Sequence, residues 1–245
     1  MSVMVNSETL SDEIWTCLSQ KDPYWSVLTI DKYHGVLSPE RRAEFFRTGE
    51  QLVSSFLKRA FRLQPQLKLT SAIDFGCGVG RLTLPLCRRV KHVFAVDVSQ
   101  TMLELCEKNC REEGFYNVIP LKSDDRLSSL DGIEADLVVS SITFQHIRPM
   151  RGLQLMEGLI RRLKPDGVLG VFVLIAGESD QPTHGADYRS IQASPESYIE
   201  MNVYSLESIV SMLSKYTDQI TLVPVPMGHQ LGADIFCARR AQSAV

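Results

Sequence analysis

The chain has 245 residues, of which 44% are hydrophobic and 22% are charged, and its net charge at pH 7 is −3. These values are typical of one water-soluble domain with a modest extension. They disfavour a nucleic-acid partner, because domains that bind nucleic acids are usually basic. No apolar run reaches the ~18 residues of a membrane span, and the acidic N-terminus lacks the apolar core of a signal peptide. We therefore expect a cytoplasmic protein without a membrane partner.

Two helices are predicted before the first strand. A short helical pattern spans 11–19, and a longer amphipathic pattern spans 39–63. The longer helix should begin with Ser38 as its N-cap and Pro39 in its first position.

Strand and helix patterns then alternate along the chain. Apolar strand patterns lie at 71–75, 92–98, 117–124, 135–143 and 167–176, and helical patterns lie between them at 80–89, 99–113 and 150–163. This alternation predicts a parallel sheet with helices on both faces, which is an α/β fold. The fourth strand is nearly all apolar, as expected for a strand buried on both sides.

The last part of the chain departs from this alternation. A helical pattern at 205–216 is followed by two strand patterns, at 219–226 and 233–240, with no helix between them. Consecutive strands joined by a short turn pair in an antiparallel way. We therefore predict an antiparallel C-terminal β-hairpin at the edge of the sheet.

Two segments are predicted to cover a site rather than to build the sheet. Residues 1–38 form a leader ahead of the main domain at 39–245, and residues 177–204 form a polar, irregular insert. Long irregular loops in compact domains often act as lids. We expect the leader to lie over a bound cofactor and the insert to be a substrate lid.

A glycine loop, DFGCGVGRL at 74–82, follows the first predicted strand. Its glycines stand at 76, 78 and 80. A dinucleotide fingerprint needs its third glycine at 81, which is Arg81, and a P-loop needs a Lys-Ser or Lys-Thr pair, which does not follow. The spacing therefore fits neither of these phosphate-binding loops.

Two carboxylates indicate another kind of ligand. Asp74 lies two residues before the first glycine, where it would repel a pyrophosphate but suit a ligand that carries positive charge. Asp97 ends the second strand, where a carboxylate can accept hydrogen bonds from both ribose hydroxyls. S-adenosylmethionine has a ribose, a sulfonium and an ammonium group, so it is the cofactor that this set predicts.

Five stretches resemble the class I S-adenosylmethionine-dependent methyltransferases: DFGCGVGRL, FAVDVSQTML, LKSDD, ADLVVSSITFQHI and LKPDGVLGVF, within 69–176. The resemblance implies a Rossmann-like, seven-stranded, mostly parallel sheet with the last strand antiparallel and the cofactor at the carboxyl ends of the strands. It places Ser99 and Met102 beside the ribose, Asp124 at the adenine amino group and Asp125 at a backbone contact. With the residues above, the predicted cofactor set is Asp74, Gly76, Gly78, Gly80, Asp97, Ser99, Met102, Asp124, Asp125 and Gln145.

The candidate for catalysis is His146, which follows the fourth strand, where substrate should meet the methyl group. A histidine can take a proton from a hydroxyl near neutral pH. Gln145 beside it is predicted to contact the methionine tail of the cofactor. The predicted substrate contacts are Tyr24 and Trp25 in the leader and Tyr188 and Arg189 in the insert.

Methyl transfer from S-adenosylmethionine to a small molecule is the predicted reaction, with oxygen slightly favoured over nitrogen as the acceptor. The alternatives are a protein or peptide methyltransferase, a nicotinamide-dependent reductase, which the loop spacing disfavours, and a non-catalytic protein that binds the cofactor. The six cysteines form no CxxC pair, so no metal site is expected. The sequence does not predict the substrate or the oligomeric state.

Overall fold

A computed structural model describes residues 10–177 and 193–240, and within them one sheet of seven strands. The strands lie in the order β3-β2-β1-β4-β5-β7-β6. Their bounds are β1 Ser71–Phe75, β2 His92–Asp97, β3 Val118–Lys122, β4 Ala135–Ser140, β5 Leu163–Ala176, β6 Ile220–Met227 and β7 Gln230–Ala238.

The strand directions confirm the predicted topology. Strands β1 to β5 pair in parallel, whereas β7 is antiparallel to both of its neighbours, β5 and β6. The strand order reverses between β1 and β4, which are adjacent in the sheet although β2 and β3 lie between them in the chain. In open α/β sheets, ligands bind outside the carboxyl ends of the strands at such a switch point. The topology therefore places a site at the ends of β1, β2 and β4.

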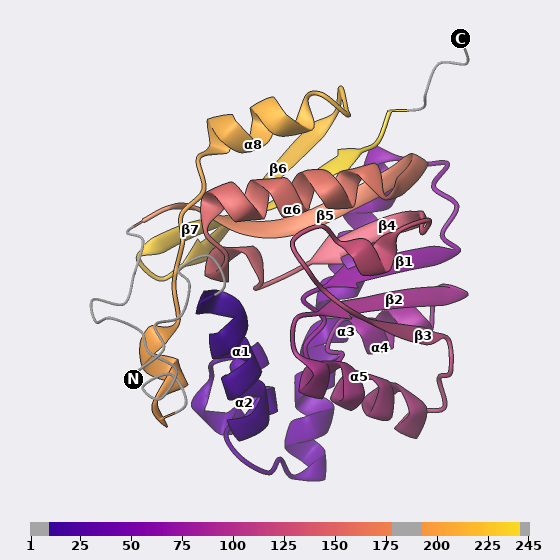
Figure 1. Ribbon diagram of the computed structural model, residues 1–245. Coiled ribbons are helices and arrows are strands. Elements are labelled where there is room, and N and C mark those ends of the chain that lie inside the picture. Colours follow the sequence, from indigo (N-terminus) through magenta and orange to yellow (C-terminus); the bar gives the residue numbers. More distant parts are fainter. Residues whose placement is uncertain (1–9, 178–192, 241–245) are drawn as a thin grey trace.

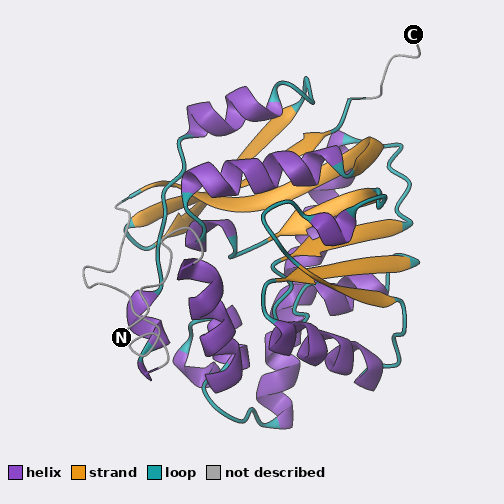
Figure 2. Cartoon of the chain, in the orientation of Figure 1, coloured by secondary structure: helices purple, strands orange, loops and turns teal. Residues whose placement is uncertain are grey.

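Helices cover both faces of the sheet (Figures 1 and 2). Helices α3 (Pro39–Leu63), α4 (Thr83–Cys87) and α5 (Gln100–Glu112) pack on one face, and α6 (Pro149–Arg161) and α8 (Leu206–Leu213) pack on the other. Ser38 caps α3 with Pro39 in the first turn, as predicted, and Ser99 caps α5.

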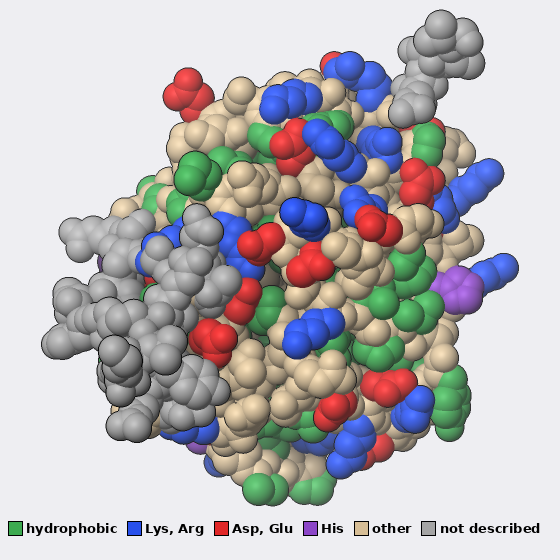
Figure 3. Space-filling model, in the orientation of Figure 1, with side chains coloured by type: hydrophobic (Ala, Val, Ile, Leu, Met, Phe, Trp, Pro, Cys, Tyr) green, Lys and Arg blue, Asp and Glu red, His purple; other side chains and the backbone are tan. Residues whose placement is uncertain are grey.

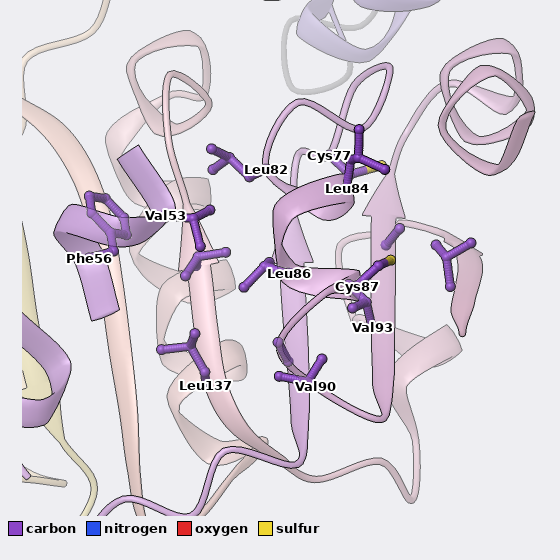
Figure 4. Close-up of a cluster of buried hydrophobic side chains, with 14 of the residues drawn as sticks. Val53, Phe56, Cys77, Leu82, Leu84, Leu86, Cys87, Val90, Val93 and Leu137 are labelled. Atoms are coloured by element: carbon purple, nitrogen blue, oxygen red, sulfur yellow. The ribbon is translucent and has the colours of Figure 1, made fainter. Parts of the chain in front are cut away.

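The core on the α3–α5 side supports the glycine loop from below. Val53 and Phe56 of α3 and Leu86 of α4 are buried in one cluster with Val93 of β2 and Leu137 of β4 (Figure 4). Burial of each such side chain stabilises the fold by roughly 1.5–3 kcal/mol. Cys77 of the glycine loop belongs to the same cluster, so the loop is anchored in the core.

The N-terminal segment forms helices α1 (Leu10–Lys21) and α2 (Pro23–Val27) and a short 3₁₀ turn, η1 (Asp31–Tyr33). The helix predicted at 11–19 is thus present and slightly longer. Ile14 and Leu18 of α1 are buried with Tyr198, which belongs to another 3₁₀ turn, η4 (Pro195–Tyr198). The leader and the end of the insert therefore share a small core of their own.

Several predicted elements are shorter in the structure, and backbone angles explain two of them. The helix expected over 80–89 is limited to α4, because Gly80 has a left-handed φ of 92° and the chain forms turns as far as Leu82. The fourth strand ends at Ser140 instead of 143, because Ile142 has a φ of 60°, which no strand accommodates. Both deviations lie at the carboxyl edge of the sheet.

A buried carboxylate joins three strands at the opposite edge. Asp136 of β4 accepts hydrogen bonds from the backbone amides of Thr70 (2.9 Å) and Ser71 (2.8 Å). It also forms an ion pair with Lys164 at 3.0 Å. We expect Asp136→Ala to lower the free energy of unfolding by about 3 kcal/mol, because it leaves these donors without their acceptor. Urea unfolding measures the change. Glu134→Ala, at an exposed neighbouring carboxylate, is the control, and an equal loss in both variants would contradict the expectation.

None of the helices among residues 10–177 and 193–240 is both long and apolar enough to cross a membrane. The same residues hold no group of three or more histidine, cysteine or carboxylate side chains arranged to bind a metal ion. All six cysteines are buried and free.

Candidate active site

A pocket lies at the carboxyl ends of β1, β2 and β4, where the topology predicts a ligand site. Its walls come from the ends of these strands, from the loop after β4, and from α1 and α2. Five residues of the predicted site line it: Gly76, Gly78, Asp97, Met102 and His146.

The glycine loop forms a cradle in which side chains would collide with neighbouring residues. Gly76 and Gly78 have left-handed φ angles of 73° and 52°. A Cβ atom on Gly76 would lie 2.2 Å from Oγ1 of Thr143, and one on Gly78 would lie 2.5 Å from Cγ2 of Val27. Only glycine combines this backbone with this close packing. The loop thus exposes its backbone to the pocket from both positions.

Asp97 holds the loop to the end of β2. One carboxylate oxygen accepts the backbone N–H of Gly78 at 2.9 Å, and the other accepts the backbone N–H of Ser99 at 2.9 Å. Burial raises the pKa of Asp97 to about 6, although these hydrogen bonds favour the charged form. Each oxygen keeps a lone pair, so the carboxylate can also accept hydrogen bonds from a ligand in the pocket.

Asp74 lies beneath the loop and not on the pocket wall. Its Oδ2 accepts a hydrogen bond from the Thr83 hydroxyl at 2.6 Å. Burial raises the pKa of Asp74 to about 7, while Thr83 and the buried Arg81 partly oppose the rise. Its side chain points to the α4 side because successive strand residues alternate between faces. The structure thus places Asp74 in the support of the loop, and its contact with a cationic ligand stays a prediction.

Ser99 and Gly80 also lie behind the pocket. The Ser99 hydroxyl is 2.7 Å from that of Ser19 in α1 and accepts the backbone N–H of Met102. A Cβ on Gly80 would meet Sγ of Cys106 at 3.0 Å. Met102 lines the pocket, whereas Ser99 and Gly80 do not.

The remaining predicted cofactor residues do not line the pocket. The Asp124 carboxylate accepts backbone amides within its own loop, from Arg126 and Ser128. Asp125 pairs with Arg151 of α6 at 2.6 Å. Gln145 is buried behind His146, and its Oε1 makes no hydrogen bond within the described residues. The spacing of a motif does not predict such local hydrogen bonds between polar side chains and the backbone.

Of the predicted substrate residues, the two in the leader pack elsewhere. Tyr24 donates its hydroxyl to Asn109 of α5 and lies edge-on to Phe45. Trp25 stacks on His34, with ring centroids 4.6 Å apart. Neither lines the pocket. Tyr188 and Arg189 lie outside the described residues.

His146 faces the pocket from a short 3₁₀ turn, η3 (Phe144–His146), which follows β4. Its Nδ1 lies 2.9 Å from the carbonyl oxygen of Glu200, and its ring lies 4.7 Å from that of Trp15 in α1. Burial lowers the pKa of His146 to about 4, so the imidazole is neutral at pH 7. A neutral imidazole can accept a proton from a bound group.

Sequence reasoning missed the wall that α1 contributes. Ser11 and Trp15 stand four residues apart, on one face of that helix, and both line the pocket together with Val27 of α2. The helical spacing in the leader was visible in the sequence. Nothing in it tells which surface that face contacts, because this depends on how the leader folds back over the sheet.

Comparison with known proteins agrees with this geometry. A family model described as a methyltransferase domain matches residues 72–167, which run from β1 into β5. The chain contains a class I S-adenosylmethionine-dependent methyltransferase domain. The magnesium protoporphyrin IX methyltransferase from Synechocystis PCC 6803, solved with bound SAM, has a similar fold with a TM-score of 0.65, at 15% identity. That similarity covers 98% of this chain and 100% of the solved chain.

Sequence relatives of the methyltransferase domain differ in their named activities. A carboxy-S-adenosyl-L-methionine synthase of Hydrogenovibrio crunogenus is 30% identical over 49% of this chain and 48% of the relative. A tRNA N(3)-methylcytidine methyltransferase of Schizosaccharomyces pombe is 23% identical over 62% of this chain and 49% of the relative. The matched part thus spans about half the length of these curated relatives.

Proposed function

We propose that this protein transfers a methyl group from S-adenosylmethionine to a small molecule. One observation carries the proposal: the glycine cradle, the Asp97 carboxylate and the neutral His146 imidazole all line one pocket. The cofactor residues and a group that can take up a proton therefore lie on the same cavity, as a transfer reaction requires.

The residues of the pocket fit the cofactor. Gly76 and Gly78 line the pocket and carry no side chain, so their backbone can approach the amino-acid end of S-adenosylmethionine closely. Asp97 would hold the ribose hydroxyls, and the apolar side chain of Met102 would lie beside it. The bound cofactor supplies a methyl group that is already activated by its sulfonium, so the protein mainly orients the reactants and excludes water.

His146 would receive the proton of a hydroxyl acceptor. The proton of a hydroxyl becomes far more acidic as its oxygen gains the methyl group. A base whose pKa is lowered to about 4 can therefore take that proton during the transfer. A neutral amine acceptor needs no such base in the methyl-transfer step, and we place oxygen slightly ahead of nitrogen for this reason.

A neutral or cationic small molecule is the acceptor that the pocket favours. Its described lining includes two carboxylates, Asp12 and Asp97, and no lysine or arginine. On the face shown in Figure 3, basic and acidic side chains are interspersed and not gathered by sign. Recognition of a phosphate backbone relies on lysine and arginine, so these features argue against a nucleic-acid substrate.

Two alternatives keep the same cofactor. A protein or peptide methyltransferase would need an open groove, whereas here α1 and α2 cover the pocket. This cover also supports our proposal that the leader, residues 1–38, acts as a lid. A non-catalytic cofactor-binding protein would bind S-adenosylmethionine and transfer nothing.

Calorimetric titration with S-adenosylhomocysteine, with NADH as the parallel control, tests the cofactor. We expect micromolar binding of the first ligand and none of the second. Preference for NADH, or no binding of S-adenosylhomocysteine, would overturn the proposal. Incubation with methyl-labelled S-adenosylmethionine and a panel of phenols, amines and peptides, followed by mass spectrometry, then separates small-molecule transfer from peptide transfer and from binding without turnover.

The affinity for S-adenosylhomocysteine should depend on pH through Asp97. The ribose contact needs the carboxylate, and the pKa of this group in the free protein is about 6. As pH falls below 6, protonation competes with binding, and Kd should rise by up to ~10-fold per pH unit. Titrations at pH 5, 6, 7 and 8 measure the change. Asp97→Asn should remove this dependence, and a variant that kept it would assign the effect to another group.

A further inference from the structure

The end of the insert is tied to the turn that carries His146. Asn202 donates its backbone N–H to the carbonyl of Gln145 at 2.7 Å. The Tyr204 hydroxyl lies 2.9 Å and 2.8 Å from the carbonyls of Phe144 and Ile147. Together with the contact from Glu200, bonds from three alternate residues of the insert reach the turn η3. The two segments are more than 50 residues apart in the chain, so this connection is purely tertiary.

The contact from Glu200 decides which nitrogen of His146 carries the proton. A carbonyl oxygen only accepts hydrogen bonds, so Nδ1, at 2.9 Å, must donate its N–H to it. In a neutral imidazole the other nitrogen, Nε2, then holds the lone pair. Nε2 has no hydrogen-bond partner among the described residues, and the side chain lines the pocket. The lone pair is therefore the part of the ring that is available to a ligand.

An ion pair holds Glu200 in place. The Glu200 side chain is 2% exposed, and Nη2 of Arg148 lies 2.8 Å from its Oε1, while Nε of Arg148 lies 3.3 Å from both carboxylate oxygens. A buried carboxylate is costly without its partner. Removing Arg148 should therefore displace Glu200, and with it the carbonyl that meets His146.

The other side of His146 is fixed by α1. The Ser11 hydroxyl donates to the His146 carbonyl at 2.7 Å, and Trp15 packs on the ring. Two of the charged groups near this region are paired: Asp12 of α1 with Arg151 of α6, and Glu200 with Arg148. Asp97, which lines the same pocket, is held by backbone amides. None of these charges acts on the imidazole strongly enough to offset its burial.

We infer that Arg148 and Glu200 are positioning residues of the active site, which hold His146 as the tautomer with its lone pair on Nε2, directed at the acceptor. This inference rests on the proposed function for the role of the lone pair, but the tautomer itself follows from the contacts alone. The end of the insert would thereby help to position the group that accepts the proton.

Long-range ¹H–¹⁵N correlation spectra of protein labelled at histidine test the tautomer directly. The chain has five histidines, and a His146→Gln variant identifies the signal of interest. In the wild-type protein we expect a neutral ring protonated on Nδ1 throughout pH 5–8. A ring protonated on Nε2, or one that titrates near 6.5, would overturn the inference whatever the activity of the protein.

Arg148→Ala tests the positioning role. We expect the His146 signal to become a mixture of tautomers, its titration to move toward pH 6.5, and kcat for a hydroxyl acceptor to fall about 10-fold with little change in affinity for S-adenosylhomocysteine. Arg148→Lys should recover part of kcat. An unchanged tautomer in Arg148→Ala would remove Arg148 from this role.

Two further variants keep the test decisive. Arg161→Ala is the matched control. Arg148 directly precedes α6, whereas Arg161 ends this helix and pairs with Glu157 at the surface, so its replacement should leave the His146 spectrum unchanged. If Arg148→Ala does not fold, Glu200→Gln weakens the same ion pair with a smaller change in shape. The His146 signal should then still show a mixture of the two tautomers. Failure of S-adenosylhomocysteine binding in the wild-type protein would count against the proposed function alone.

Discussion

Asp97→Ala is expected to weaken binding of S-adenosylhomocysteine by about 100-fold. The carboxylate holds the loop through Gly78 and Ser99 and, in the proposed complex, also accepts the ribose hydroxyls. Hydrogen bonds to a charged group contribute roughly 1.5–3 kcal/mol each, and 1.4 kcal/mol corresponds to a tenfold change in Kd. Loss of two such bonds to the ligand accounts for the expected change. Calorimetric titration measures it.

Matched variants separate this effect from a general loss of negative charge. Asp97→Asn keeps one acceptor oxygen and should lose about 10-fold in affinity. Asp131→Ala removes a carboxylate of similar size whose side chain is 76% exposed, and it should bind S-adenosylhomocysteine as the wild type does. Wild-type affinity in Asp97→Ala would show that the ligand does not use the end of β2.

His146→Ala is expected to lower kcat for a hydroxyl acceptor by about 100-fold, because general-base catalysis commonly contributes that much or more. Affinity for S-adenosylhomocysteine should stay within a few-fold. With cofactor saturating, the acid limb of kcat in the wild-type protein should lie near pH 4. Burial lowers the pKa of His146 to about 4, and the ring loses its lone pair only below that pH. Steady-state kinetics across pH 4–9 measure both effects.

His34→Ala is the control for this variant. This histidine stacks on Trp25 outside the pocket, so kcat and its pH profile should match those of the wild-type protein. An acid limb near 6.5 in the wild-type protein, or full activity of His146→Ala toward a hydroxyl acceptor, would contradict a role for His146 as the base.

The fold could be predicted from the sequence because local signals and global pattern agreed. Alternating strand and helix patterns placed the parallel strands and their helices, and the short turn between the last two strands gave the hairpin. The glycine spacing and Asp97 pointed to the edge of the sheet where the pocket lies, because the carboxyl ends of parallel strands meet there.

The orientation of polar side chains beside the loop could not be predicted from the sequence. Asp74 lies near the end of β1, and Asp124 and Gln145 follow β3 and β4, yet none of the three lines the pocket. Spacing in the chain fixes where a Cα lies relative to a strand end. It does not fix which of several nearby donors a carboxylate or an amide will meet.

The sequence by itself determined the strand and helix segments, the glycine loop and the acidic group at the end of β2, because these depend on residues close together in the chain. Only the tertiary structure decided what surrounds His146. Trp15 comes from far ahead of it and Glu200 from far behind it, and both reach the ring only after the leader and the insert fold over the strand ends. Burial by these distant segments makes the imidazole neutral, and the Glu200 carbonyl directs its lone pair.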